Sequence, residues 1–433
     1  MNTSIAIMAA GLGTRMKSTL PKVLHEISGF EMLYHIIKEA QKISDDIHVI
    51  LYHQSDLVQE RMNRYFSNIT YIIQDHQNFP GTGGAIRGVI PKYEQLLVLN
   101  GDMPLLEAAH MQNFMHMQAD VIMSAFTAQE PFGYGRVIMD AQYNVQKIVE
   151  EKDATSEEKT VTAVNAGVYL FKTNFLNENL PKLSNHNSQK EYYITDLIAL
   201  ANASNQTVKA LFVDESTFMG VNSKYHLSQA EELMQHRIKR RFMEKGVSMR
   251  LPQTIYIEAD VEIKGECKLE NGVTLLKGTV LENAHIKAHS VIEKSIIKNS
   301  DIGPMARVRP DSCIEDTHIG NFVEIKKSTL KGVKAGHLSY LGDACIDEGT
   351  NIGCGTITCN YDGKSKYKTV IGKNVFIGSD SQLIAPITIA DDVIIASGTT
   401  VTKNIPQGAL AINREPLKIM EGFFYKFFGK KDA

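Results

Sequence analysis

The chain has 433 residues, of which 43% are hydrophobic and 22% charged, with a net charge of −3. This is the composition of a globular protein, and a chain of this length predicts two or more domains. No basic cluster is large enough to hold a nucleic-acid backbone, which argues against nucleic acid as a partner. No apolar run approaches the ~20 residues that span a bilayer, and no cationic leader precedes the first apolar run. We therefore expect a cytoplasmic protein without a membrane span.

A glycine-rich loop follows the first predicted strand, Ser4–Met8. Gly11 and Gly13 let backbone N–H groups approach a phosphate without a Cβ in the way. Arg15 and Lys22 supply charge for more than one phosphate group. The Gly-Lys-Ser/Thr of a P-loop and the third glycine of a dinucleotide fingerprint are missing. The loop is thus a candidate site for a nucleotide, of a kind different from either of those motifs.

Up to about residue 222, short β-branched runs alternate with helix-like patterns. The expected strands include Ile47–Leu51, Ile69–Ile73, Leu96–Leu99 and Val121–Ala125, and the expected helices include Glu31–Lys42 and Leu57–Tyr65. This alternation predicts an α/β domain, a Rossmann-like and mostly parallel sheet with helices on both faces. Ligands of such sheets bind at the carboxyl ends of the strands, where Asp102 follows Leu96–Leu99. Asp102 is a candidate Mg²⁺ ligand, with a capping aspartate in a turn as the alternative.

Residues 223–246 form one charged helical pattern with a thin apolar stripe, which we interpret as a rigid linker. From residue 247 to the end, apolar residues recur every six positions. They are Ile257, Ile263, Leu269, Leu275 and Leu281, then Ile302, Val308 and Ile314, then Ile371, Ile377, Leu383, Ile389, Ile395 and Val401. This period predicts a left-handed parallel β-helix of hexapeptide repeats, with three hexads a coil.

The hexads are interrupted at two places, Lys326–Leu341 and Asn360–Tyr367. Insertions into a solenoid fall on one face and commonly carry its function. The five cysteines also lie in this half, at positions 267, 313, 345, 354 and 359. Their odd number and their spacing predict neither disulfides nor a metal cluster, and we expect reduced thiols.

Motifs along the whole chain resemble one family. The N-terminal motifs are Met8-Ala-Ala-Gly-Leu-Gly-Thr-Arg-Met16, Leu20-Pro-Lys-Val-Leu-His25, Gly81-Thr-Gly83, Gly101-Asp102, Gly133-Tyr-Gly-Arg136, Asn165-Ala-Gly167 and Gly220-Val-Asn222. The C-terminal motifs are Arg307-Val-Arg-Pro310, Ala335-Gly-His-Leu-Ser-Tyr340, Asn351-Ile-Gly353 and Thr356–Gly363. The chain resembles the bacterial bifunctional enzymes that are both N-acetylglucosamine-1-phosphate uridylyltransferase and glucosamine-1-phosphate N-acetyltransferase. The resemblance implies cytoplasmic UDP-N-acetylglucosamine biosynthesis, which supplies peptidoglycan and lipopolysaccharide.

For the first domain, the resemblance implies a site for UTP, Mg²⁺ and N-acetylglucosamine 1-phosphate. The loop residues Met8, Ala9 and Gly11 would hold the nucleotide, and Arg15 and Lys22 its phosphates. The uracil would contact Gln74, Gly81 and Thr82, although Gln77 is an alternative to Gln74. The metal would bind Asp102 and Asn222, and the sugar would bind Gly135, Glu150 and Asn165.

For the β-helix, the resemblance implies acetyl transfer from acetyl-CoA to glucosamine 1-phosphate. His337 would be the general base, since an imidazole suits proton transfer near neutral pH, and Glu324 is a candidate to orient it. The sugar phosphate would contact Arg309, Lys326, Tyr340, Asn351 and Lys366. Acetyl-CoA would contact Asn360, Tyr361, Cys354, Ser379, Ser397 and Arg414. The resemblance also implies a homotrimer with this site between subunits.

Cys354 and Ser397 stand where the family usually has alanine, so the coenzyme contacts at these two positions are open. Cys354 also suggests a covalent acyl-cysteine route, against which we prefer direct transfer to the amine. The aromatic tail Phe423–Phe428 is interpreted as a short helix that packs on a coil or a neighbouring subunit, with a membrane-surface helix as the alternative.

Two other functions fit parts of the sequence. One is a nucleotidyltransferase whose β-helix is only a scaffold, as in ADP-glucose pyrophosphorylases. The other is a non-catalytic assembly subunit, as in nucleotide-exchange subunits of a translation initiation factor. The residues around His337 argue against the first, and intact Arg15, Lys22, Asp102 and Asn222 argue against the second. Because the two sites lie on separate domains, we expect the acetylated intermediate to diffuse freely between them.

Overall fold

The computed structural model describes residues 3–429. They form two compact units, and the chain passes from the first to the second between Arg237 and Ile238. This point lies inside helix α7 (Lys224–Glu244), which covers most of the expected linker. The division of the chain at residues 222 and 246 stays a prediction. Within residues 3–429, no helix combines the length and hydrophobicity needed to cross a membrane.

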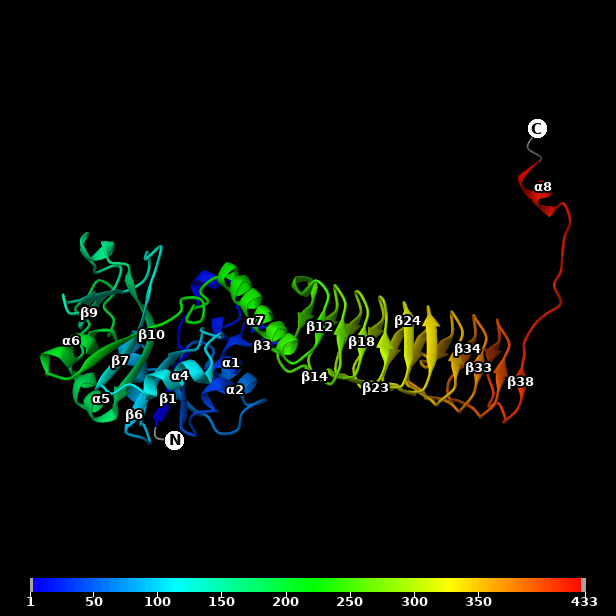
Figure 1. Ribbon diagram of the computed structural model, residues 1–433, viewed down its shortest axis with the longest axis horizontal. Helices are drawn as coiled ribbons and strands as arrows, with labels where there is room; N and C mark the ends of the chain where they lie inside the picture. Colours follow the sequence, from blue (N-terminus) through cyan, green and yellow to red (C-terminus); the bar gives the residue numbers. More distant parts are fainter. Residues whose placement is uncertain (1–2, 430–433) are drawn as a thin grey trace. The chain divides into compact units, whose positions relative to one another are not determined.

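The first unit contains a mixed sheet whose strands run in the order β11-β7-β10-β6-β1-β4-β5, with β8 attached to β10 and β9 attached to β8 (Figure 1). The strands are β1 Thr3–Met8, β4 Ile47–Leu51, β5 Thr70–Ile73, β6 Gln95–Asn100, β7 Val121–Thr127, β8 Arg136–Met139, β9 Val145–Val149, β10 Ala163–Lys172 and β11 Val208–Phe212, beside the small pair β2 Glu26–Ile27 and β3 Phe30–Glu31. The α-helices are α1 Met32–Ala40, α2 Ser55–Met62, α3 Thr82–Ala85, α4 Ala108–Met115, α5 Thr173–Asn179 and α6 Asp196–Ala203.

The predicted α/β class is confirmed, with one addition in the middle of the sheet. Strand β10 runs antiparallel to both of its neighbours, β6 and β7, while the other pairs along the path are parallel. Its register shifts between Asn165 and Tyr169, where Gly167 has φ 81°. A bulge of this kind re-aims side chains, and this one begins at Asn165, a predicted sugar contact.

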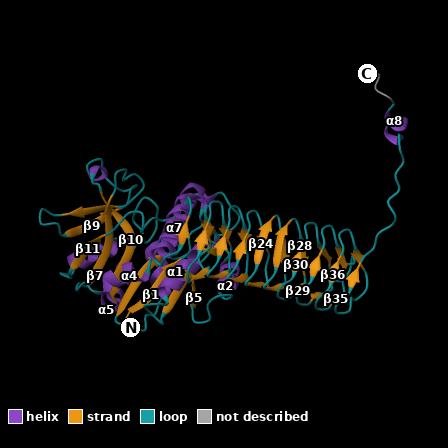
Figure 2. Ribbon diagram, turned by 45° about the vertical axis from the view of Figure 1, so that its right-hand side comes forward, coloured by secondary structure: helices purple, strands orange, loops and turns teal. Residues whose placement is uncertain are grey.

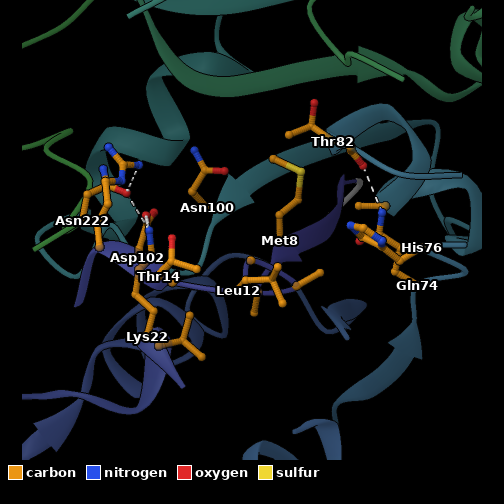
Figure 3. Close-up of a pocket in the computed structure, with 18 of the residues that line it drawn as sticks. Met8, Leu12, Thr14, Lys22, Gln74, His76, Thr82, Asn100, Asp102 and Asn222 are labelled. Atoms are coloured by element: carbon orange, nitrogen blue, oxygen red, sulfur yellow. Dashed lines mark hydrogen bonds and ion pairs between the residues drawn. The ribbon is translucent and has the colours of Figure 1, made fainter. Parts of the chain in front are cut away.

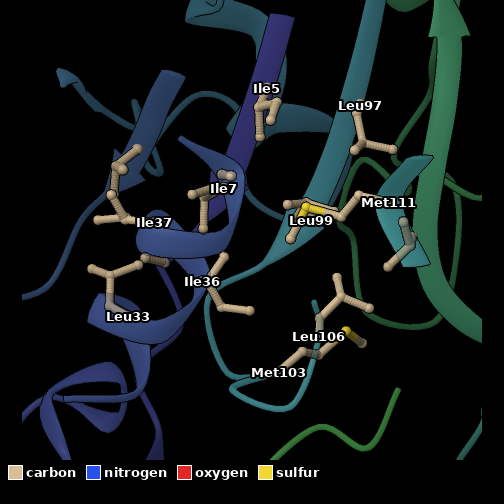
Figure 4. Packing of buried hydrophobic residues seen from close by; sticks show 14 of the residues in the cluster. Ile5, Ile7, Leu33, Ile36, Ile37, Leu97, Leu99, Met103, Leu106 and Met111 are labelled. Carbon is tan, nitrogen blue, oxygen red and sulfur yellow. The ribbon is translucent and has the colours of Figure 1, made fainter. Parts of the chain in front are cut away.

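Alternate residues of the strands enter two cores, one on each face of the sheet. Ile5 and Ile7 of β1 are fully buried with Leu33 and Ile36 of α1 (Figure 4), whereas Ala6 is buried in the other core, together with residues of α5 and α6. Because strand side chains alternate between faces, a strand that is apolar at every position must be covered on both sides. This explains why the strands read as unbroken apolar runs.

The second unit is a left-handed parallel β-helix of three sheets, drawn as a series of stacked coils in Figure 2. One sheet comprises β12 Ser248–Met249, β15 Lys268–Leu269, β18 His285–Ile286, β21 Asp301–Ile302, β24 His318–Asn321, β27 Lys334–His337, β30 Asn351–Ile352, β33 Phe376–Ile377, β36 Ile394–Ile395 and β38 Leu410–Ala411. The next comprises β13 Tyr256–Ile257, β16 Thr274–Leu275, β19 Val291–Ile292, β22 Arg307–Val308, β25 Glu324–Lys326, β28 Tyr340–Gly342, β31 Ile357–Cys359, β34 Gln382–Ile384 and β37 Thr400–Val401. The third comprises β14 Glu262–Lys264, β17 Val280–Glu282, β20 Ser295–Lys298, β23 Ser312–Glu315, β26 Thr329–Lys331, β29 Ala344–Ile346, β32 Thr369–Ile371 and β35 Ile387–Ile389.

The predicted hexad residues point into this β-helix and are buried, except for the half-buried Ile263. Some sides of the coils have five residues instead of six, as between Ile292, Ile297 and Ile302. In a five-residue side, the residue with positive φ comes two positions after the inward residue, as Asn299 does after Ile297. In a six-residue side, it comes three positions after the inward residue, as Met305 does after Ile302. The left-handed residue makes the corner, so one residue can be lost without breaking the coil.

One of the two predicted interruptions is wrong. Lys326–Leu341 is a regular part of the β-helix, because it contains β26 and β27 with Leu330 and Ala335 fully buried. Its five-residue sides hid the repeat. The other, Asn360–Tyr367, is a true insertion closed by a bridge between Tyr361 and Lys366.

The tail ends in the short helix α8 (Phe423–Phe428), whose aromatic side chains are exposed. The expected packing of this helix on a coil of the same chain is therefore not observed in the described residues. Packing on another subunit stays a prediction. The five cysteines are free thiols.

Candidate functional site

A cavity of about 420 Å³ opens at the carboxyl ends of β1 and β6 (Figure 3). Ten residues predicted from the sequence line it: Met8, Ala9, Gly11, Arg15, Lys22, Gln74, Gly81, Thr82, Asp102 and Asn222. In Figure 3, Asp102 and Asn222 lie at one end and Gln74 and Thr82 at the other. The cavity thus has an end rich in charged groups and an end with amide and hydroxyl groups.

The glycine-rich loop forms one wall of the cavity. A Cβ at Gly13 would lie 2.8 Å from the Cβ of Lys22, and Gly13 has φ 62°, so both the space and the backbone conformation require glycine. A Cβ at Gly11 would meet no protein atom within 4 Å. Gly11 therefore leaves room in the cavity itself, where backbone N–H groups can approach a phosphate.

Four side chains make a compact cluster at the charged end. The Lys22 ammonium contacts the Asp102 carboxylate, and its Nζ also donates to Asn222 Oδ1 at 2.8 Å. Arg15 Nη2 donates to the same oxygen at 2.8 Å. Two side-chain oxygens from different loops therefore lie around one position, which the Lys22 ammonium occupies.

This donor set fits a magnesium ion. Mg²⁺ takes oxygen ligands and usually binds one or two protein oxygens, keeping water or phosphate oxygens in its other positions. A carboxylate and an amide oxygen are both present in the cluster, as Asp102 and Asn222. Among the described residues, no group of three or more His, Cys, Asp or Glu side chains forms a metal cage, so only this sparse kind of site is available.

The other end of the cavity presents an oriented amide. Gln74 is buried, and its Nε2 donates to Phe79 O and Gly81 O at 3.0 Å each. Because both amide hydrogens are used, Gln74 Oε1 is the atom left to accept a hydrogen bond from a ligand. Gln77 is not among the lining residues, which favours Gln74 of the two alternatives.

The predicted sugar contacts lie together but outside the lining of this cavity. Asn165 donates its backbone N–H to Gly135 O at 2.8 Å, and a Cβ at Gly135 would lie 3.4 Å from Glu150 Oε2. Glu150 Oε1 accepts a hydrogen bond from Thr195 at 3.1 Å. Burial raises the pKa of the Glu150 carboxyl above its ordinary value. Glycine at position 135 keeps the space in front of this carboxylate free.

Several lining residues were not predicted as contacts. His76 stacks on Tyr52 with ring centroids 4.6 Å apart, Asn100 ends β6, and Glu191 enters from the loop before α6. Asn100 could have been found, because it ends the strand before Asp102. Glu191 belongs to a region remote in sequence, and only the fold brings it to the cavity.

In the β-helix, the strand register aligns four predicted residues along one corner. The inward residues Ala335, Ile352, Ile377 and Ile395 are successive partners in one sheet. Two positions after them come His337, Cys354, Ser379 and Ser397, one in each consecutive coil. The predicted base and three predicted coenzyme contacts therefore lie on one line along the β-helix, here called the corner column.

Three of the predicted sugar-phosphate contacts, Arg309, Lys326 and Tyr340, follow the neighbouring sheet, whereas Asn351 lies in the sheet of the corner column and Lys366 in the 360–367 insertion. Arg309 Nη1 donates to Glu324 Oε1 at 2.9 Å, so in the described residues this carboxylate pairs with Arg309 and not with His337. Lys366 lies beside Lys326 and lowers the pKa of its ammonium, an effect to which Arg309 adds. Tyr340 follows Glu324 in the register, and Asn351 lies in β30. Clustered cations of this kind are suited to an anion such as a phosphate.

The remaining predicted coenzyme contacts lie near the insertion and the tail. Asn360 Nδ2 donates to Asp343 at 2.5 Å, and Tyr361 Oη donates to Gly363 O at 2.7 Å inside the 360–367 loop. Arg414 Nη2 donates to Ser397 O at 3.2 Å, next to the corner column. The structure thus groups the predicted residues at both ends of the column.

Comparison with known proteins gives matches in both units. The MobA-like NTP transferase domain family matches residues 5–163, and the bacterial transferase hexapeptide family matches residues 368–403. Bifunctional protein GlmU of a Nitratiruptor species is 63% identical over 99% of this chain and 100% of its own length. The proteins of the same name from Aliarcobacter butzleri and Wolinella succinogenes are 59% and 56% identical over 99% of both chains.

Proposed function

The chain belongs to the GlmU family of bifunctional proteins, and we propose that the cavity of the first unit and the corner column of the second are its two active sites. It is a uridylyltransferase and an N-acetyltransferase. It acetylates glucosamine 1-phosphate with acetyl-CoA and then transfers UMP from UTP to N-acetylglucosamine 1-phosphate, giving UDP-N-acetylglucosamine and pyrophosphate. The scaffold and assembly-subunit alternatives are thereby set aside.

In uridylyl transfer, the side chains at the charged end hold the triphosphate. Arg15 and Lys22 bind the phosphate oxygens that become pyrophosphate, and Asp102 and Asn222 would hold Mg²⁺. The metal would supply positive charge that offsets the charge of the phosphates during in-line displacement. Gln74 Oε1 accepts a hydrogen bond from the N3–H of uracil, a donor that cytosine lacks. Gly135, Glu150 and Asn165 orient the sugar so that its phosphate oxygen approaches the α-phosphorus.

In acetyl transfer, His337 removes a proton from the amine of glucosamine 1-phosphate as the nitrogen attacks the thioester carbonyl. The C–N bond forms, the C–S bond breaks, and the coenzyme A sulfur leaves with a proton. Arg309, Lys326 and Lys366 hold the sugar phosphate. Cys354, Ser379 and Ser397 line the path of the coenzyme from the base, with Asn360, Tyr361 and Arg414 beside it.

A homotrimer completes the acetyl-transfer site in this proposal. The corner column lies on the outside of the β-helix, with His337 exposed. Apolar side chains of the same sheet are also exposed in the last coils, at Phe376, Ile394 and Leu410. Apolar surface of this kind favours contact with another protein surface, and a second copy of the chain would enclose the column. The five free cysteines fit the reducing cytoplasm that we expect as its location.

The observation that carries the proposal is the separation of the predicted residues into two groups, one in each unit. The test uses Asp102→Ala and His337→Ala beside the wild type, with products measured by mass spectrometry. One assay supplies glucosamine 1-phosphate and acetyl-CoA, and the other N-acetylglucosamine 1-phosphate, UTP and Mg²⁺. We expect Asp102→Ala to abolish only uridylyl transfer and His337→Ala only acetyl transfer. Loss of both activities in either variant would contradict two independent sites.

A further inference from the structure

The proposed sugar site lies at one end of the β8–β9 hairpin. Arg136 begins β8 and is the register partner of Val149, the last residue of β9. The loop with Gly133 and Gly135 therefore enters the hairpin beside the point where Glu150 leaves it. Two segments that would hold one sugar are thus separate pieces of chain, and a contact must keep them in register.

Arg136 makes such a contact from inside the protein. Its side chain is only 2% exposed, and its Nη2 lies 2.8 Å from Glu151 Oε2. Its Nη1 also donates to the backbone oxygen of Tyr134, in the loop. The guanidinium thereby binds the loop on one side and the residue after Glu150 on the other.

Glu151 contacts both Arg136 and the loop that contains Gly133. Its Oε2 accepts the backbone N–H of Gly133 at 3.1 Å, in addition to the contact with Arg136. Gly133 has φ 86°, and a side chain added there would meet nothing within 4 Å. The Glu151 carboxylate therefore holds the Gly133 end of the loop, while the hydrogen bond from Asn165 N–H holds Gly135 O at the other end.

A buried guanidinium with a single carboxylate partner is expensive in free energy and is not explained by stability alone. The Nε of Arg136 is buried without a hydrogen-bond partner, which adds to that cost. The chain keeps this charge at the point where Gly135 leaves the Glu150 carboxylate free, with a Cβ–Oε2 distance of 3.4 Å if alanine stood there.

We propose that Arg136, through Glu151, is a positioning residue for the sugar phosphate acceptor: the pair fixes the Gly133–Gly135 loop against Glu150. The inference rests on the proposed sugar site. A shift of about 1 Å in such a site reduces activity by up to about a hundredfold. The nucleotide end of the cavity makes no described contact with Arg136 and keeps its geometry when the pair is broken.

The test measures both substrates in Arg136→Met. We expect KM for N-acetylglucosamine 1-phosphate to rise about tenfold to a hundredfold, with KM for UTP unchanged. Arg136→Lys should restore part of the loss, because an ammonium can still reach Glu151. Glu151→Gln is the second variant and should shift the same KM. Lys147→Met is the matched control, since Lys147 lies in β9 of the same hairpin and pairs with Glu158 at 2.8 Å while half exposed.

Acetyl transfer by the same samples gives the concentration of enzyme, and an unchanged KM for UTP shows that the first unit is folded. An equal rise of KM for UTP in Arg136→Met and Glu151→Gln would overturn the inference, since the pair would then be a general structural element. An unchanged sugar KM in both variants would also overturn it. Glu150→Gln tests the proposed sugar site separately from the role of Arg136. If this variant leaves KM for N-acetylglucosamine 1-phosphate unchanged, the proposed sugar site is wrong, whatever the result for Arg136.

Discussion

In the first unit, ten of the predicted residues come from several distant loops and line one cavity of about 420 Å³, whereas in the β-helix four predicted residues come from the same corner of consecutive coils. A parallel sheet brings the ends of its strands to one edge, so loops from different parts of the chain surround a ligand. A solenoid repeats each position along its axis, so its side chains form a line with one side open. The comparison explains why a single chain suffices for the first site and why a second copy is proposed for the other.

The strongest test of this difference is metal removal. Because the proposed Mg²⁺ ligands Asp102 and Asn222 lie in the first unit, we expect a chelator to abolish uridylyl transfer and to leave acetyl transfer unchanged. Both activities are measured on one dialysed sample before and after chelation, and added Mg²⁺ should restore the first. A parallel loss of acetyl transfer would show that the β-helix site also depends on a metal.

A second test replaces one glycine in each unit, Gly81 or Gly353, by alanine. A Cβ at Gly81 would lie 2.7 Å from Tyr192 O, and Gly81 has φ 90°, while a Cβ at Gly353 would lie 2.6 Å from Ile377 O in the next coil. Strain of about 1–3 kcal/mol corresponds to about fivefold to 150-fold in rate if it is relieved by moving the site. We expect Gly81→Ala to lower uridylyl transfer alone and Gly353→Ala to lower acetyl transfer alone. Each variant's other activity is its control.

Regular spacing decided how much of the fold could be predicted. From Ile371 to Val401 each interval is six residues, and each predicted inward residue is buried. The five-residue sides near Leu330 and Ala335 were mistaken for an interruption, because a corner residue with positive φ absorbs the missing position and leaves no signal in the period. Strand β10 was missed for a similar reason: its bulge at Asn165–Tyr169 breaks the pattern that identifies a strand.

The members of both sites were predicted from motifs, but their arrangement was not. His337, Cys354, Ser379 and Ser397 are separated by unequal lengths of chain, because the 360–367 insertion lies between two of them. Only the strand register shows that they share a corner. The pairing of Glu324 with Arg309 was equally inaccessible, since it depends on which side chains face each other across two coils. The roles of these residues stay predictions until the variants are measured.

A smaller effect concerns the stability of the first unit. Burial raises the pKa of Glu150 above its ordinary 4.5, so the folded state is destabilised relative to the unfolded chain as pH rises through the raised value. We expect Glu150→Gln to raise the Tm of this unit at pH 7, and the gain to disappear well below pH 4.5, where the carboxyl is protonated in both states.

Glu158 is the matched control for that measurement. Its carboxylate is partly exposed, and Lys147 lowers its pKa, so the sign is reversed and Glu158→Gln should not stabilise the unit at pH 7. A loss of stability in Glu150→Gln would mean that Glu150 is kept for folding and not for the sugar. A gain would fit a carboxylate kept at the expense of stability, as expected in a binding site.

The smallest expected effect is at Cys354, and it decides how the corner column works. The Cys354 thiol lies in the coil that follows the coil of His337, so it is the candidate for a covalent acyl carrier beside the proposed base. Direct transfer needs only a neutral side chain at that position, and alanine preserves the coil while it removes the thiol. We therefore expect Cys354→Ala to keep the acetyl-transfer rate within about twofold. The rate is measured with saturating acetyl-CoA. A loss comparable to that of His337→Ala would instead require a thioester on the enzyme, and the column would then be a relay between two nucleophiles and not a path along which one coenzyme lies.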